Sequence, residues 1–221
     1  MTKKSPRSYD DACATAHALD LIGDRWALLV MRELMLGPRR FGDLRASLPG
    51  VSANVLTQRL EGLESSKIVR RRKLPPPASV QVYELTEWGL EARPIVLELG
   101  KWAVRSPFHD PTLPLSPVAL MLSFQAKFDP TVAGDLDVSL GFRFEDEAFT
   151  VSVRDGVLVT ERGDPERADA RVIGAPSAVA GVMYGKAPLA ELQAAGALSV
   201  TGDVAAFMRF ADLYEMPPKA T

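Results

Sequence analysis

Residues 52–64, SANVLTQRLEGLE, and residues 68–85, IVRRRKLPPPASVQVYEL, decide the fold of the first half of the chain. The first segment has leucines at helical spacing, and Ser52 at its start can cap a helix. The second segment changes period, because a basic run and three prolines lead into alternating apolar and polar residues. We therefore expect a helix followed at once by a basic β-hairpin.

Further helices are expected on both sides of this pair. Asp24 can cap the second of them, Thr86 can cap the last, and Pro94 should kink that last helix. The order of three helices, strand, basic loop, strand and helix predicts a mostly α winged helix-turn-helix, in which the last helix before the hairpin enters the major groove. The expected flanking helices span about residues 11–21, 26–36, 41–48 and 87–104.

One face of the helix at residues 52–64 carries polar side chains opposite its leucines. Asn54 and Gln58 can make bidentate contacts to adenine, and Thr57 suits either a polar or an apolar contact. Arg59 lies nearer the core edge and is expected to reach a phosphate. The alternative is an ordinary solvated helix face, which would carry similar residues.

Positive charge concentrates around this helix. Residues 1–110 hold 17 Lys and Arg against 13 Asp and Glu, a net of +4, whereas residues 111–221 hold 9 against 15, a net of −6. Such a split predicts a first domain that faces a polyanion, although a basic run can also be a solvated strand. The candidate DNA contacts are Arg39, Arg40, Ser52, Asn54, Thr57, Gln58, Arg59, Arg70, Arg71, Arg72 and Lys73.

From Cys13 to Trp102 the chain resembles the HxlR family of bacterial winged-helix transcription regulators. The matching stretches are ALDLIGDRWALLVMREL, RRFGDLRASLPGVSANVLTQRLEGLE, IVRR and VYELTEWG. The resemblance implies an obligate homodimer on a double-stranded DNA operator, with the first and last helices of the domain at the dimer contact. The chain departs from the family at Ala14 and at Asp24-Arg25, which lie in the dimer region.

Cys13 is the single cysteine of the chain. Some HxlR-like proteins use the matching cysteine to sense oxidants or electrophiles, so Cys13 is a redox-sensing candidate. His17 would share its helix face and could lower the pKa of the thiol. The alternative is a buried structural cysteine. Two ligands do not complete a metal shell, so we expect neither a metal nor a cofactor.

The composition excludes other classes of protein. Hydrophobic residues make up 47% and charged residues 24%, which is typical of a globular chain. No apolar run is long enough to cross a bilayer, and the start MTKKSPRSYDD does not resemble a secretory signal. We expect a cytoplasmic protein without a membrane partner. Prolines between residues 107 and 117 predict two domains, 1–110 and 111–221.

The second half alternates as strands do and then becomes helical, which predicts an α+β domain with helices on one face of a sheet. Asp155-Gly156 predicts a hairpin turn. The stretches FTVSVRDGVLV and residues 169–210 are similar to the sterol carrier protein fold, whose members bind apolar molecules. No nucleophile and base pair is visible, so we expect no enzyme activity.

Two hypotheses about the whole chain follow from these halves. In the first, the protein is a transcription repressor that an apolar or lipid-like small molecule controls through the second domain. In the alternative, the protein is a carrier of lipids or other apolar ligands, and its winged helix serves only for protein contacts.

Overall fold

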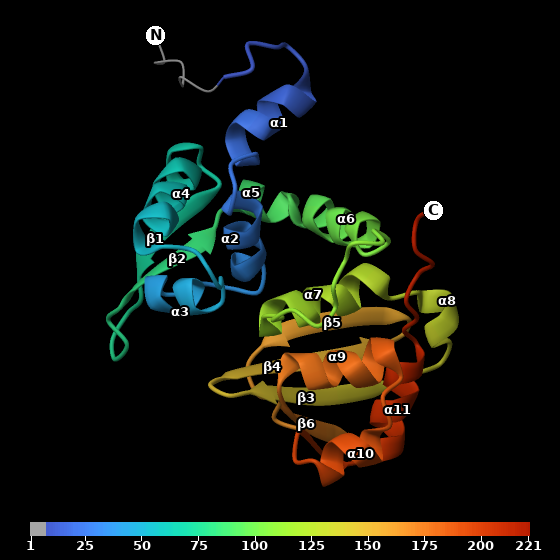
Figure 1. Ribbon diagram of the computed structural model, residues 1–221. Coiled ribbons are helices and arrows are strands. Elements are labelled where there is room, and N and C mark those ends of the chain that lie inside the picture. The colour runs from blue at the N-terminus through green and yellow to red at the C-terminus, as the bar shows by residue number, and fades with distance from the viewer. Residues whose placement is uncertain (1–7) are drawn as a thin grey trace. The chain divides into compact units, whose positions relative to one another are not determined.

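The computed structural model describes residues 8–221, which form two compact units (Figure 1). The first unit runs to Val96 and the second begins at Leu97. Part of the N-terminal stretch that we examined for a secretory signal lies outside the described residues. Within residues 8–221, no helix has the length and apolar character that a membrane span requires.

The first unit is a winged helix-turn-helix, as the sequence predicted. Leu56, Leu60 and Leu63 are buried on the inner face of α4. The leucine face of this helix therefore packs into the core, opposite its polar face. The elements are α1 (Ala14–Ile22), α2 (Ala27–Leu34), α3 (Phe41–Ala46), α4 (Ala53–Ser65), β1 (Val69–Lys73), β2 (Gln81–Leu85) and α5 (Glu87–Glu91), with α6 (Arg93–Ala103) following.

Two of the three predicted helix caps are present. The Ser52 hydroxyl accepts a hydrogen bond from the Val55 N–H at 3.3 Å, and the Thr86 hydroxyl accepts one from the Gly89 N–H at 3.0 Å. The cap predicted at Asp24 is wrong, because α2 begins only after Trp26, whose φ of +80° is left-handed. The predicted last helix is interrupted before Pro94, which lies in the first turn of α6, where its missing N–H costs no hydrogen bond.

The second unit is an α+β fold built on a five-stranded sheet of order β5-β4-β3-β6-β7. Strands β3, β4 and β5 form an antiparallel meander, whereas β6 pairs with β3 in parallel. The Asp155-Gly156 turn between β4 and β5 has positive φ at both residues, as a type I′ hairpin requires. The strands are β3 (Val138–Phe144), β4 (Glu147–Arg154), β5 (Val157–Arg162), β6 (Ala170–Gly174) and β7 (Leu198–Gly202).

Aromatic side chains fill the space between this sheet and its helices. Phe124 on α7 lies 5.7 Å from Phe142 on β3 and 5.5 Å from Phe210 on α11, measured between ring centroids. Each of these three rings is completely buried. The helices are α7 (Pro117–Lys127), α8 (Pro130–Ala133), α9 (Pro176–Gly185), α10 (Leu189–Ala194) and α11 (Val204–Asp212). Figure 1 shows α7, α9 and α11 beside the sheet.

Candidate nucleic-acid interface

The outer face of α4 presents the side chains that the sequence singled out for reading bases. Asn54, Thr57 and Gln58 are all exposed, on the side of the helix opposite its buried leucines. Ser52 is also exposed, and its hydroxyl is used as the helix cap. A duplex that approached this face would meet two amides and a hydroxyl, which are donors and acceptors suited to base edges.

The β1–β2 hairpin lies next to α4 in the chain and carries the exposed cations. The side chains of Arg70, Arg71 and Arg72 are 64%, 48% and 44% exposed. Arg71 pairs with Glu64 at the end of α4, with 2.7 Å between Nη2 and Oε2. This ion pair joins the hairpin to α4.

Glu84 on β2 accepts hydrogen bonds from two arginines of β1. Its Oε1 lies 2.7 Å from Nε of Arg70, and its Oε2 lies 2.9 Å from Nη2 of Arg72. Burial alone would raise the pKa of Glu84, but the hydrogen bonds from the two arginines outweigh it, and the pKa is lowered. We did not foresee these partners from the sequence, although antiparallel pairing of the predicted strands places Arg70 opposite Glu84.

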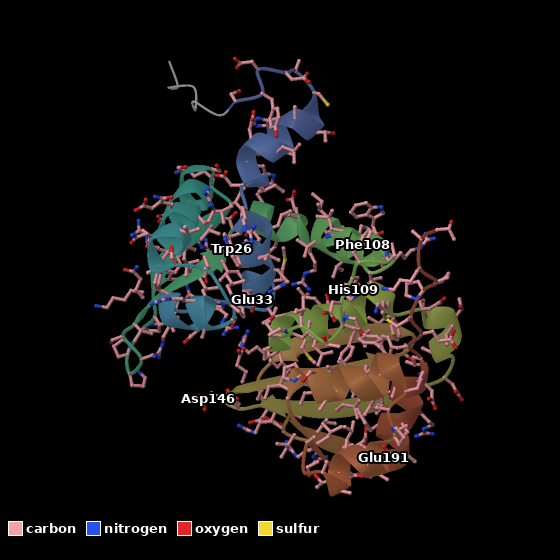
Figure 2. The ribbon with its side chains drawn as sticks, in the orientation of Figure 1. Trp26, Glu33, Phe108, His109, Asp146 and Glu191 are labelled. Carbon is pink, nitrogen blue, oxygen red and sulfur yellow. The ribbon has the colours of Figure 1, made fainter. Side chains whose placement is uncertain are left out.

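Arg39 does not belong to the exposed set, contrary to the sequence prediction. Its side chain is only 6% exposed, and its Nη1 lies 3.5 Å from Oε2 of Glu33, which is completely buried on α2 (Figure 2). Its backbone N–H and carbonyl both pair with Tyr83 of β2, at 2.9 and 2.8 Å. A buried carboxylate needs a cation, and two arginines share this role. Arg32 donates from Nη2 to Oε1 of Glu33 at 2.7 Å, and Arg39 faces Oε2. Arg40, the next residue, is exposed.

Arg59 is also placed differently from the prediction of a phosphate contact. Its guanidinium forms an ion pair with the Asp24 carboxylate, and its side chain is 17% exposed. Arg59 therefore ties α4 to the loop before α2 and does not extend from the reading face. Asp24, which we expected to cap α2, is therefore an ion-pair partner of Arg59.

Cys13 is exposed at the N-terminus of α1, which excludes the buried structural role. Hydrogen bonds from the backbone N–H groups of Ala16 and Thr15 lower the pKa of its thiol. The expected cause, His17, is not among the groups that lower it. A helix N-terminus stabilises a thiolate, since its free N–H groups point at the sulfur.

Residues 21–109 match the family model of the HxlR-like helix-turn-helix, and residues 114–220 match that of the alkyl sulfatase C-terminal domain. An uncharacterised HTH-type transcriptional regulator of Synechocystis, sll1512, is 39% identical over 89 residues, which cover 40% of this chain and 66% of that protein. A second one, YvaP of Bacillus subtilis, is 37% identical over 86 residues, which cover 39% of this chain and 80% of that protein.

A solved structure of the redox regulator HypR in its oxidised form is 32% identical, covers 41% of this chain and 94% of that one, and has a TM-score of 0.39. The sequence matches cover α4, the β1–β2 hairpin and the helices around them. On those matches, the chain belongs to the HxlR-like helix-turn-helix family.

Proposed function

We propose that this DNA-binding transcription regulator is a homodimeric repressor that acts in the bacterial cytoplasm. Asn54, Thr57 and Gln58 would read base edges in the major groove, while Ser52 and the cations of the hairpin would contact phosphates. The observation that carries the proposal is the exposure of these polar side chains on α4 beside an exposed arginine run on β1. Arg40 and Lys73, which are also exposed, would add phosphate contacts.

Exposed apolar side chains support a second copy of the chain as a partner. Ile95, Leu99 and Trp102 on α6 are 49%, 42% and 76% exposed, and Leu19 on α1 is 47% exposed. Large apolar groups that remain in water favour burial in an interface. A two-fold dimer would place two α4 helices on successive major grooves, which predicts an operator with two half-sites.

The second unit would serve as a sensor in this proposal. The family matches end at residue 109 and resume at residue 114, which supports domains at 1–110 and 111–221. A sheet with helices on one face is consistent with a sterol carrier protein-like fold, and an apolar effector would bind there without enzyme chemistry. Control of transcription then requires different affinities of the effector for the two DNA-binding states.

Cys13 would provide a separate redox input. The name of HypR describes a redox regulator, and Cys13 combines exposure with a thiol pKa below its usual value. Oxidation would change the N-terminus of α1. An operator-binding assay before and after peroxide treatment, with the Cys13→Ser variant as control, tests this input, and equal binding in all four samples contradicts it.

The direct test of the main proposal is a mobility-shift assay with the DNA upstream of the protein's own gene. We expect a retarded band for that fragment and not for a shuffled fragment of equal length. Affinity should fall steeply between about 50 and 200 mM salt, because phosphate contacts release counterions. Absence of salt-dependent binding to any genomic fragment would contradict DNA recognition and favour the alternative of an apolar-ligand carrier.

A further inference from the structure

Four side chains with polar groups gather where α7, α9 and the end of α11 meet in the second unit. Ser123 and Lys127 lie one helical turn apart on α7, Tyr184 is near the end of α9, and Tyr214 follows α11. The rings of Tyr184 and Tyr214 are perpendicular, with centroids 6.0 Å apart. This cluster borders the aromatic core, because Tyr214 also packs against Phe124 at 5.4 Å.

Lys127 has no counterion in this cluster. Its Nζ lies 3.8 Å from the centroid of the Tyr184 ring and 3.2 Å from Sδ of Met216. Within residues 8–221, no carboxylate oxygen lies within 4.0 Å of it. The ammonium group is therefore half-buried against an aromatic ring and a thioether. No carboxylate of the described residues lies close enough to stabilise its charged form.

Burial lowers the pKa of Lys127 from 10.5 to about 8. At a pH of about 7.5, roughly a quarter of such amines are neutral, against about 0.1% for a lysine with the usual pKa. Burial raises the pKa values of Tyr184 and Tyr214, so neither phenol ionises to pair with the ammonium. A neutral amine in an apolar site is a nucleophile at physiological pH.

The hydroxyl groups around Lys127 differ in how they are used. The Tyr184 hydroxyl lies 2.6 Å from Oγ of Ser123, so these two groups satisfy each other. The Tyr214 side chain is completely buried, and its hydroxyl has no hydrogen-bond partner within the described chain. Buried polar groups are normally paired, so the Tyr214 hydroxyl is the member of this cluster whose hydrogen-bonding capacity is still available to a polar atom of a ligand.

We propose that Lys127 is a covalent capture site for small apolar aldehydes, which it holds as an imine. The amine lone pair attacks the carbonyl carbon, and the carbonyl oxygen takes a proton to give a carbinolamine. Loss of that oxygen as water, with release of the nitrogen's proton to solvent, forms the C=N bond. Aldehyde and amine thus give imine and water, without any oxidant or reductant. The Tyr184 ring and Met216 favour an apolar substituent on the aldehyde.

Reductive trapping tests the proposal on the full chain without DNA, so its result is independent of the proposed regulation. The protein is incubated with benzaldehyde and cyanoborohydride at a pH of about 7.5, and labelling of each lysine is measured by peptide mass spectrometry. We expect labelling of Lys127 at least about tenfold faster than labelling of the exposed Lys73, because of its larger neutral fraction. Equal rates at the two lysines would overturn the proposal.

Two controls separate capture from general reactivity. Lys127→Arg keeps the cation but cannot form the imine, so the fast phase of labelling should disappear while Lys73 is labelled as before. An unchanged fast phase would overturn the assignment to Lys127. Glyoxylate, a charged aldehyde, should label Lys127 less selectively over Lys73 than benzaldehyde does, and the reverse order would overturn the apolar preference.

Discussion

Two arginine regions of the first unit have opposite roles, although both came from the same basic pattern in the sequence. Arg39, between α2 and α3, is 6% exposed and faces the completely buried Glu33. Arg70 and Arg72, on β1, are 64% and 44% exposed and share Glu84, whose side chain is 12% exposed. Both carboxylates are largely buried, so the exposure of the arginine itself, and not the count of cations, decides whether it supports the fold or remains available to a phosphate.

The free energy lost on breaking an ion pair depends on how far the pair is exposed to water. Removing the sole partner of a buried charge costs about 3–5 kcal/mol. The cost at Arg39 should be lower, because Arg32 still pairs with Glu33. An exposed pair contributes about 0–1 kcal/mol, because water and salt screen it. The comparison therefore predicts large stability effects at Arg39 and large binding effects on the hairpin.

Arg39→Ala should have the largest effect. We expect a loss of about 1.5–3 kcal/mol in the free energy of unfolding, because Glu33 loses one of its two arginine partners and keeps Arg32. Arg40→Ala is the matched control, since Arg40 is exposed and its substitution should stay within about 0.5 kcal/mol. Urea unfolding measures both, and similar effects for the two variants would break the comparison.

Gln58→Ala tests α4, the helix that precedes the hairpin. A bidentate contact to a base contributes about 1–3 kcal/mol of discrimination, so the variant should lose that much preference for the operator over shuffled DNA. Its thermal unfolding should remain that of the wild type, because Gln58 is exposed. Ser65→Ala, at the exposed end of α4, should keep full preference. Unchanged preference in Gln58→Ala would remove this residue from the reading face.

Local signals made the structure of α4 predictable from the sequence. The leucine spacing of α4 and the Ser52 and Thr86 caps depend on neighbours within a few residues, and all of them are present. The alternation of β3 and β4 and the Asp155-Gly156 turn are also local features. Residues that are close in sequence determine such features, so they can be predicted without knowledge of the tertiary structure.

The errors have tertiary causes. The sequence predicted that Arg59 and Arg39 are surface cations. Their partners are Asp24 and Glu33, which are distant in sequence or on another element and approach them only in the folded chain. The left-handed φ of Trp26 likewise has no local signal, because a tryptophan ahead of an apolar run favours helix. The parallel pairing of β3 with β6 joins strands that are distant in sequence, and no alternation pattern encodes it.

Arg72→Ala sharpens the hairpin side of the comparison. It should weaken binding equally for operator and non-operator DNA and reduce the slope of log affinity against log salt by about 1, as expected for one phosphate contact. The free energy of unfolding should change by about 1 kcal/mol or less, because this arginine is 44% exposed. Filter-binding titrations across salt concentrations measure the slope. A selective loss of operator binding would instead assign Arg72 to base reading.

Glu84→Gln should have a small effect on stability and should change DNA binding in the opposite direction to Arg72→Ala. The lowered pKa of Glu84 means that the carboxylate stabilises the fold above its usual pKa of 4.5, and this contribution is lost as the pH falls through the lower folded pKa. The free energies of unfolding of wild type and variant should differ by about 1 kcal/mol or less near neutral pH, because the arginines are exposed. This difference should disappear in acid.

The neutral amide of the variant leaves Arg70 and Arg72 free for phosphates and removes a repulsive charge, so DNA affinity should rise at low salt. Weaker DNA binding by the variant would mean that Glu84 positions the arginines, and the wing would then resemble the buried Arg39 region in requiring its carboxylate.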